Sequence, residues 1–565
     1  MAEYLSPGVY VEEYDNSPRS IEGVGTSTAG FIGLAERGPV SGAPLLVTNF
    51  KDFTRQFGGF LSEFTFGEYR FLANCVEQFF VNGGTRCYVS RVAPEDACEA
   101  EKKVGPLTVK AANPGKWGNR VQVMVSAVNQ KKLQLIAKSG DSYVARSMDG
   151  FREGDIVCIG EEYNRIVSIY DETVTFEKPF EAEVVDDKII PQTVLYRVLM
   201  NVSIRYNDEV ENYQGLTFNP ADPDYIVTRM AGSELVTLTA EPVEEIGNPA
   251  AAIFGEGQTD GMFSLEKGSD GSVSKINAET FIGVDNGPGQ RSGIASFVEN
   301  NIVSMMALPG ITIPEVLVAL VSHCENMKSR FAVIDMPGDM YKTPDLINYR
   351  NIIDTSYAAM YHPWIQVYDR SQSKPAYIPP SGAVLGIYSR TDINRGVHKA
   401  PANEVVFCTG LKTNYSKGEQ DILNPAGVNL IRALPGQGIR IWGARTASSN
   451  SAFKYVNVRR LFIYVEESIK MNTNWVVFEP NDAMLWQRVQ LTVSSFLDGL
   501  WRNGMLFGST PEEAFFVEIG TSTMTKDDIM NGRLICNIGI APVRPAEFVV
   551  FRVTQFTAEA GGSEG

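Results

Sequence analysis

The residue types that most often do chemistry are few in this sequence and widely spaced. Its three histidines are His323, His362 and His398, and none has a second ligand at the spacing typical of zinc sites. His323 and Cys324 are neighbours on a predicted helix, where residues i and i+1 do not face each other, so local geometry gives no nucleophile–base pair. A catalytic or metal site would have to be assembled from distant residues.

Sequence signatures of cofactor binding are missing as well. The glycine-rich stretches 287–293 and 436–443 do not have the GxGxxG spacing, and no GxxxxGK[ST] motif occurs. The seven cysteines are an odd number without a CxxC pair, which predicts neither a disulfide framework nor a zinc cage. We therefore expect no cofactor, no metal and no enzyme activity.

One alternative, a cytosolic α/β enzyme, depends on three residues. Asp335 ends a predicted strand, the position at which α/β enzymes often carry catalytic groups. Because no companion motif accompanies it, a capping or turn role fits Asp335 better. Asp335, His362 and Arg390 are the residues to test for the enzyme alternative.

Length and charge narrow the classes of protein further. The chain has 565 residues, a formal net charge of −17 and 44% hydrophobic residues, which predicts a globular protein of three or four domains. The acidic excess opposes binding to nucleic acid phosphates. The first residues lack the regions of a signal peptide, and prolines and glycines interrupt the apolar stretch 302–321. We expect a soluble protein made in the cytoplasm, without membrane insertion.

Hydrophobic periodicity predicts an α/β core of mixed sheets flanked by helices. From residue 302 onward strands and helices alternate, as in a mostly parallel sheet covered by helices. The predicted elements are, in order, a buried run at 29–35, a helix at 68–82, strands at 86–92 and 302–308, a helix at 314–328, a strand at 331–335, a helix at 344–358 and a strand at 364–368.

Two other regions have a different character. Between about 95 and 260, short alternating strands separated by Gly, Asp and Glu turns predict an inserted β-rich domain or pair of domains. After a proline-rich connector at 373–381, the last third contains a strand around 439–441 and two amphipathic helices. The first helix spans 456–471, and the second follows an N-cap at Asn481 or Asp482.

Both ends of the chain carry segments that favour strands. Near the N-terminus, Val9, Tyr10 and Val11 lie in a β-favouring run between turn signals. A second such segment spans 547–556 and has apolar side chains on both faces, namely Phe548, Val549, Val550, Phe551 and Val553. A strand that is apolar on both faces must be buried in a sheet, either of its own chain or of another chain, and the sequence leaves both possibilities open.

Eight short segments, in order along the chain, carry a family resemblance. They are SPGVYVEE (6–13), NPGKWGN (113–119), PPSGAVLG (379–386), RTD (390–392), GVHKAPAN (396–403), IWGART (441–446), NVRR (457–460) and FEPN (478–481). Together they resemble the contractile tail sheath family, which includes the sheaths of contractile-tailed phages, R-type bacteriocins and extracellular contractile injection systems. The resemblance is densest from about residue 376 to residue 556.

This resemblance implies a structural protein and not a catalyst. Sheath subunits polymerise around an inner tube in a metastable extended state, and contraction drives the tube through a target envelope. The implied partners are further copies of the same chain, an inner tube protein, and baseplate and terminator or cap proteins. The implied location is the cytoplasm of the producing bacterium during assembly, and then a phage tail or a released or anchored contractile particle.

The resemblance also implies roles for particular residues. The two terminal strands would cross to neighbouring subunits and complete their sheets. We expect Arg445, Arg459 and Arg460 at or near contacts with other subunits or the tube, while pairing inside the domain with carboxylates such as Glu466 is an equal alternative. A capsid-like or cell-surface lattice protein, which would assemble as sheets or shells, is a third class beside the sheath and the enzyme.

The expected organisation has five parts. They are an N-terminal arm at 1–20, a discontinuous α/β domain at 21–95 and 265–375, an inserted β-rich outer domain at 96–264, a tube-proximal assembly domain at 376–545 and a C-terminal arm at 546–565.

Overall fold

The computed structural model describes residues 20–180, 184–185, 188–189, 194–242, 247–369, 373–550 and 552. The predicted N-terminal strand with Val9, Tyr10 and Val11 lies outside the described residues, and so do Phe551 and Val553. The chain divides into two compact units. Unit 1 consists of Met1–Phe31, Asn74–Tyr88 and Asn300–Gly565, and unit 2 consists of Ile32–Ala73 and Val89–Glu299. The five-part organisation expected from the sequence stays a prediction.

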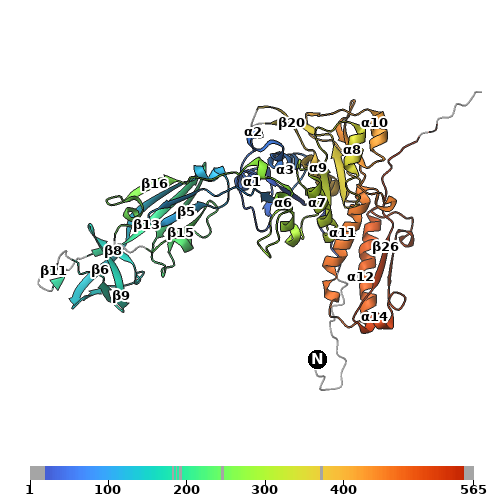
Figure 1. The fold of residues 1–565 in the computed structure, drawn as a ribbon. Coiled ribbons are helices and arrows are strands. Elements are labelled where there is room, and N and C mark those ends of the chain that lie inside the picture. Colours follow the sequence, from blue (N-terminus) through green and yellow to red (C-terminus); the bar gives the residue numbers. More distant parts are fainter. Residues whose placement is uncertain are drawn as a thin grey trace, which may run out of the picture. The chain divides into compact units, whose positions relative to one another are not determined.

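A largely parallel sheet forms the centre of unit 1 (Figure 1). The strands of this sheet that lie wholly or partly in unit 1 follow the order β3-β1-β17-β18-β19-β23-β24, with bounds Cys87–Val92, Ala29–Leu34, Met305–Ala307, Phe331–Asp335, Ala358–His362, Val428–Leu434 and Gly438–Ile441. Pairing is parallel from β1 through β23, and β24 is antiparallel to β23. Every residue of β1, β17, β18 and β19 is buried, as expected for a parallel sheet with both faces covered. The predicted mixed α/β fold is confirmed.

Helices and a small second sheet complete this part of unit 1. Helices α7 and α9 both pack on β18. The helix bounds are α3 Leu72–Val81, α7 Pro314–Met327, α8 Thr343–Arg350, α9 Ser381–Arg395 and α10 Lys417–Leu423. The small sheet has the order β21-β20-β22, with bounds Lys374–Ile378, Ile365–Asp369 and Gly410–Leu411.

Two stretches of unit 1 differ from the predictions. Helix α8 ends at Arg350 and not near residue 358, and Ala358–His362 forms the buried strand β19. The predicted connector at 373–381 contains β21, and helix α9 begins at its end. The sequence does not predict helix α9, because Gly382 and Gly386 have a low helix propensity.

Those two glycines are required by the packing of α9 on α3. A Cβ atom on Gly382 would overlap the main-chain carbonyl of Cys75, and one on Gly386 would overlap the carbonyl of Phe79. Only residues without a side chain allow the two helices to approach this closely. Tertiary packing therefore overrides the weak local preference for helix in this segment.

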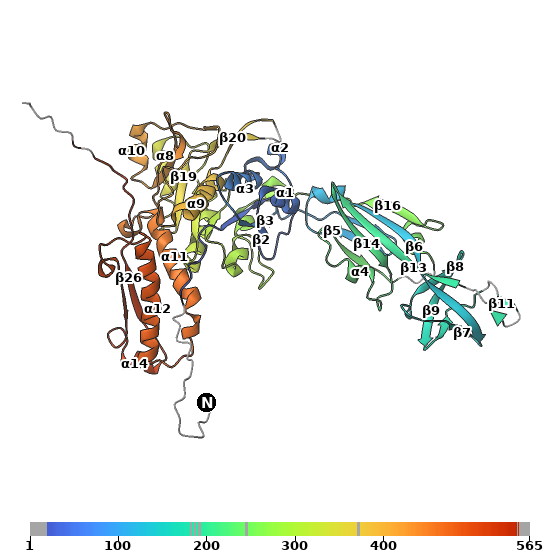
Figure 2. The ribbon, with the colours of Figure 1, turned by 180° about the vertical axis from the view of Figure 1, so that it is seen from behind.

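The C-terminal part of unit 1 contains the two amphipathic helices that the sequence predicted. Helix α11 spans Val456–Asn472 and α12 spans Ala483–Arg502, and the side chain of Asp482 caps α12 by accepting from the Leu485 amide. Two antiparallel strands, β25 (Phe515–Ile519) and β26 (Cys536–Ile540), form a sheet that packs on α12. Figure 1 and Figure 2 both show β26 running beside α12. Their shared core includes Leu461, Val465, Val489, Val493 and Leu497.

Unit 2 is built around two long strands, β6 (Gln122–Ser139) and β13 (Val194–Tyr206). At one end they close a six-stranded antiparallel barrel in the order β13-β8-β9-β10-β7-β6, with β6 paired back to β13. The other four bounds are Ile156–Ile159, Glu162–Tyr170, Thr173–Phe176 and Ser142–Ala145. Leu133, Tyr143, Val157, Ile166 and Val174 belong to the barrel core.

At their other end the same two long strands belong to a sandwich. Strands β14 (Glu209–Leu216) and β16 (Asp260–Ser264) flank them, and the sheet β15-β5-β4 shares their core around Trp117. Those three strands span Val236–Ala240, Leu107–Ala111 and Glu101–Val104. The helices α1 Phe50–Phe57, α2 Glu63–Phe66, α4 Ile226–Arg229, α5 Pro249–Phe254 and α6 Ala278–Ile282 also lie in unit 2. The β-rich character of this region agrees with the sequence prediction.

No helix within the described ranges is both long enough and apolar enough to span a membrane.

Candidate subunit-linking segments

The C-terminal segment leaves the body of unit 1 as an exposed apolar run. Phe548, Val549 and Val550 are 75%, 68% and 77% exposed, and none of them lies in a strand. The part of the predicted terminal strand that the structure describes is therefore not paired within its own chain. Three adjacent large apolar side chains in water favour burial against a partner.

Glu547, immediately before this run, is held by the body of unit 1. Its carboxylate accepts hydrogen bonds from Arg445 Nε and Nη2 at 2.8 and 2.7 Å, from Asn424 Nδ2 at 2.7 Å and from the Tyr455 hydroxyl at 3.0 Å. Partial burial raises the pKa of Glu547, but these hydrogen bonds outweigh it and hold the pKa below its ordinary value. The chain is thus fixed at residue 547 and exposed directly after it.

The three arginines singled out in the sequence all make contacts inside the chain. Arg445 pairs with Glu547 as described, and Arg460 donates to both carboxylate oxygens of Asp392, at 2.9 and 2.5 Å. The side chains of Arg460 and Asp392 are each only 3% exposed.

Arg459 has partners of another kind. Its guanidinium lies 3.6 Å from the ring centre of Phe453 and 4.5 Å from that of Tyr357, and its Nε donates to Ser356 Oγ. Pairing within the domain, the alternative from the sequence, accounts for the charged partners of Arg445 and Arg460, although these partners are Glu547 and Asp392 and not Glu466. A contact of any of the three arginines with another subunit or a tube stays a prediction.

The sheet β25–β26 offers edges to which another strand could add. It has only two strands within the described part of the chain, so each strand has one edge without a strand partner. Phe516 on β25 is 54% exposed. Unpaired strand edges of this kind are templates for main-chain pairing with another chain.

Asp335, the first residue of the enzyme alternative, acts as a buried connector. One carboxylate oxygen accepts from the Ser381 amide at 2.8 Å, and the other accepts from Ser381 Oγ at 2.6 Å and the Gly310 amide at 3.0 Å. The carboxylate therefore joins the end of β18 to the start of α9 and to the turn before α7. Burial raises its pKa to about 6, although the hydrogen bonds from Ser381 and Gly310 oppose the rise. The capping role expected for Asp335 is what these contacts describe.

His362 and Arg390 have separate partners. His362 is fully buried, its Nε2 lies 2.9 Å from the Tyr415 hydroxyl oxygen, and burial lowers its pKa to about 4. Arg390 donates to the Val405 carbonyl at 2.7 Å. The contacts of Asp335, His362 and Arg390 lead to three different sets of neighbours. Over the described ranges, no group of three or more His, Cys, Asp or Glu side chains is arranged to hold a metal ion.

The buried Asp335 carboxyl predicts a measurable pH dependence. Its pKa is about 6 in the folded chain and about 3.9 in an unfolded chain, so the folded chain binds this proton more tightly. The contribution of Asp335 to the free energy of unfolding should therefore increase by about 3 kcal/mol as pH falls from about 7 to 4, at about 1.4 kcal/mol per pKa unit.

The measurement compares denaturant unfolding of the wild type and Asp335→Asn between pH 4 and pH 7. The variant is needed because His323 and His362 change the free energy of unfolding in the opposite direction. Burial lowers the pKa of both histidines to about 4, so their contribution to the free energy of unfolding decreases as pH falls below about 6.5, the pKa in an unfolded chain. Subtracting the two curves isolates Asp335. Parallel curves for the two proteins would contradict the prediction.

Family models and curated relatives both match phage tail sheath proteins. The model of the phage tail sheath protein central domain matches residues 287–447, and the model of the phage tail sheath C-terminal domain matches residues 448–556. The tail sheath protein of Salmonella phage ViI is 27% identical in an alignment of 250 residues, and the match covers 39% of this chain and 38% of that protein. The tail sheath protein of Vibrio phage KVP40 is 23% identical in an alignment of 392 residues, and the match covers 64% of this chain and 56% of that protein. The chain therefore matches less than two thirds of the length of these two relatives.

A solved structure has the same fold over the whole length. It is the sheath complex of an extracellular contractile injection system, PVC, in the contracted state, with a TM-score of 0.54, 21% identity and coverage of 99% of this chain and 100% of that chain. The two consecutive family models, the curated relatives and the shared fold agree with the family resemblance drawn from the eight sequence segments. Residues 287–556 therefore carry the central and C-terminal domains of the phage tail sheath family.

Proposed function

We propose that this chain is the structural subunit of a contractile sheath, which polymerises around an inner tube in a metastable extended state and contracts to drive the tube through a target envelope. The observation that carries the proposal is the exposed apolar run Phe548–Val550, which begins directly after the fixed residue Glu547. Binding of a second chain over these three side chains would remove their apolar surface from water.

In the proposed assembly, the segment around Phe548, Val549, Val550, Phe551 and Val553 adds to a sheet of a neighbouring subunit. The open edges of β25 and β26 are the receiving site that we propose. The N-terminal strand with Val9, Tyr10 and Val11 makes a second link of the same kind. Strand addition uses main-chain hydrogen bonds, so subunits remain linked while rigid domains rotate and their other contacts change.

The same proposal includes the polymer, its other protein partners and the source of the energy of contraction. Copies of one chain joined head to tail, through a contact that does not close on itself, form a filament or stacked rings. The other partners are an inner tube protein, a baseplate and a terminator or cap protein, and assembly takes place in the cytoplasm of the producing bacterium. The energy of contraction comes from subunit contacts that change between two states and not from a catalysed reaction.

Electron microscopy of the full chain, expressed and purified alone, tests the proposal. We expect wide hollow tubes in negative stain under conditions that favour assembly. A monodisperse monomer under the same conditions would contradict the proposed function. Flat sheets or closed shells would support the lattice class instead.

A further inference from the structure

The N-terminal segment of the described chain, residues 20–26, lies against helix α11. Asn472 Nδ2 donates to the Glu22 carbonyl at 2.9 Å, the Val24 amide donates to Ser468 Oγ at 3.1 Å, and Arg460 Nη2 donates to the Thr26 carbonyl at 2.9 Å. The segment therefore runs antiparallel to α11, with its main chain held by side chains of the helix.

The residues of α11 that touch this segment have a regular spacing. They are Arg460, Tyr464, Ser468 and Asn472, each four positions after the last, so they lie along one slowly turning stripe of the helix. Tyr464 takes part through packing, because a Cβ atom on Gly23 would overlap its hydroxyl group. The segment thus contacts α11 along about three turns of the helix.

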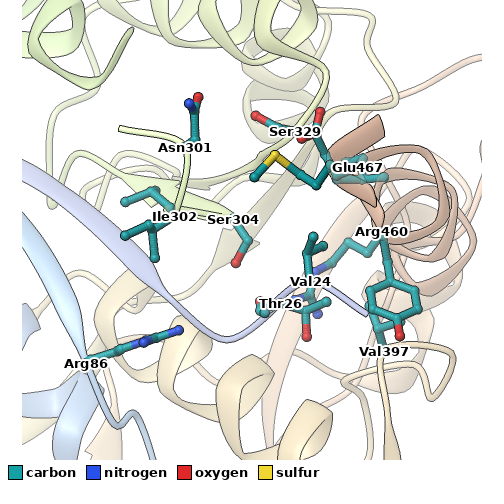
Figure 3. A pocket seen from close by; sticks show the side chains of 15 residues that line it. Val24, Thr26, Arg86, Asn301, Ile302, Ser304, Ser329, Val397, Arg460 and Glu467 are labelled. Atoms are coloured by element: carbon teal, nitrogen blue, oxygen red, sulfur yellow. Dashed lines mark hydrogen bonds between the residues drawn. The ribbon is translucent and has the colours of Figure 1, made fainter. Parts of the chain in front are cut away.

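On another side the segment borders a cavity and not a packed core. A cavity of about 210 Å³ is lined by Val24 and Thr26 of the segment together with Ile302, Ser304 and Glu467. Figure 3 shows Val24 and Thr26 beside Arg460 at the wall of this cavity. The segment is therefore attached by its hydrogen bonds to α11 and by the side chain of Ile21, which is buried in the same apolar cluster as Leu461 and Val465 of that helix.

The beginning of α11 holds the C-terminal segment in a similar way. Asn457 Nδ2 donates to the Val543 carbonyl at 3.0 Å, and Tyr455, the residue directly before the helix, donates through its hydroxyl to Glu547 at 3.0 Å. One helix therefore contacts the chain on the inner side of both terminal arms.

We propose that α11 is the internal link between the two arms of a subunit, so that a pull on either arm passes through this helix to the other arm. The inference rests on the proposed function, because the arms experience tension only if neighbouring subunits hold them. Arg460, Ser468 and Asn472 act as positioning residues for the N-terminal arm, and Asn457 and Tyr455 act for the C-terminal arm. In a polymer, this arrangement would connect successive subunits through one helix.

The first test is hydrogen exchange of the full chain with the double substitution Ser468→Ala and Asn472→Ala. Both side chains bond only to the main chain of the segment or to their own helix in the contacts described, so the fold should persist. We expect exchange in peptides covering residues 20–26 to become about tenfold faster, since two hydrogen bonds are lost. Exchange in the core strands β18 and β19 should not change. Unchanged exchange at 20–26 would overturn the anchoring role.

The second test measures how well assembled tubes resist denaturant. We expect tubes of the double variant, and of Tyr455→Phe, to dissociate at a lower denaturant concentration than wild-type tubes. Asn474→Ala is the matched control, because Asn474 lies just beyond α11 and donates to Met471 within its own turn. Tubes of the double variant as resistant as the control would overturn the role of α11 as a link. Failure of the wild type to form tubes would contradict the proposed function, whatever exchange shows at residues 20–26.

Discussion

Deletion of residues 548–565 is expected to abolish tube formation while both units of the chain stay folded. The deletion removes the exposed run that begins at Phe548 and keeps Glu547, whose carboxylate hydrogen bonds to Arg445, Asn424 and Tyr455 remain. Because Phe548, Val549 and Val550 bury little surface within the chain, the free energy of unfolding should change by less than about 0.5 kcal/mol.

The measurement combines negative-stain microscopy with thermal unfolding of the full chain and the deletion variant. Deletion of residues 559–565 alone is the matched control, because it keeps the β-favouring segment 547–556 and should keep the tubes. Tubes that persist without residues 548–565 would contradict the arm mechanism. A large drop in the unfolding temperature of the longer deletion would mean that this segment supports the fold of its own chain.

The parts of the fold that the sequence predicts well are those with a strong local pattern. Helices α7, α11 and α12 have clear apolar stripes and start or stop signals such as Pro314 and Asp482, and the structure places their ends close to the predicted ones. Strand β19 was not predicted, because Ala358–His362 lacks the β-branched residues that indicate a strand. Its strand conformation depends on pairing with β18 and β23 on its two sides.

Long-range pairing explains the other part of the fold that could not be predicted. The sequence predicts short strands between about 95 and 260, but it does not indicate that β6 and β13 are continuous or that they close a barrel. Closure depends on the register between Gln134 and Val194 and on the pairs beyond them, and no local pattern encodes which strands become neighbours.

In the candidate site, too, the residues with a local sequence pattern could be predicted and the long-range contacts could not. Apolar residues on both faces of the C-terminal segment are a local signal that a sheet covers it, and the sequence leaves open whether that sheet belongs to the same chain or to another. Phe548–Val550 are exposed in the described chain, and their pairing with a neighbouring subunit stays a prediction. The hydrogen bonds that hold the two terminal segments leave no such local signal in the sequence. Glu547 accepts from Arg445, about a hundred residues away, and Asn472 donates to the Glu22 carbonyl across 450 residues. The arginines were singled out by type, yet their role inside the chain depends on carboxylates that only the fold brings near.

Substitution of Gly382 by alanine is expected to destabilise unit 1 by about 3 kcal/mol or more, at the upper end of the range for overpacked cores. The added methyl group would meet the main-chain carbonyl of Cys75 in α3, which cannot move aside as a flexible side chain could. The matched control is Gly499→Ala in α12, where nothing lies within 4 Å of the new atom. That change should stabilise the chain by about 0.5 to 1 kcal/mol, because alanine favours helix more than glycine does.

Thermal unfolding of the two glycine variants checks the sign of each effect, and hydrogen exchange shows how far the first one spreads. Helix α9 carries Ser381, which bonds to Asp335, near one end and Asp392, which pairs with Arg460, near the other. If α9 is pushed away from α3, Asp392 shifts and Arg460 loses part of its hold on the Thr26 carbonyl, so exchange at residues 20–26 should also rise in Gly382→Ala but not in Gly499→Ala. A Gly382→Ala protein as stable as the wild type would show that α3 and α9 can separate without cost, and the close contact of these helices would then not be what positions the anchor of the N-terminal arm.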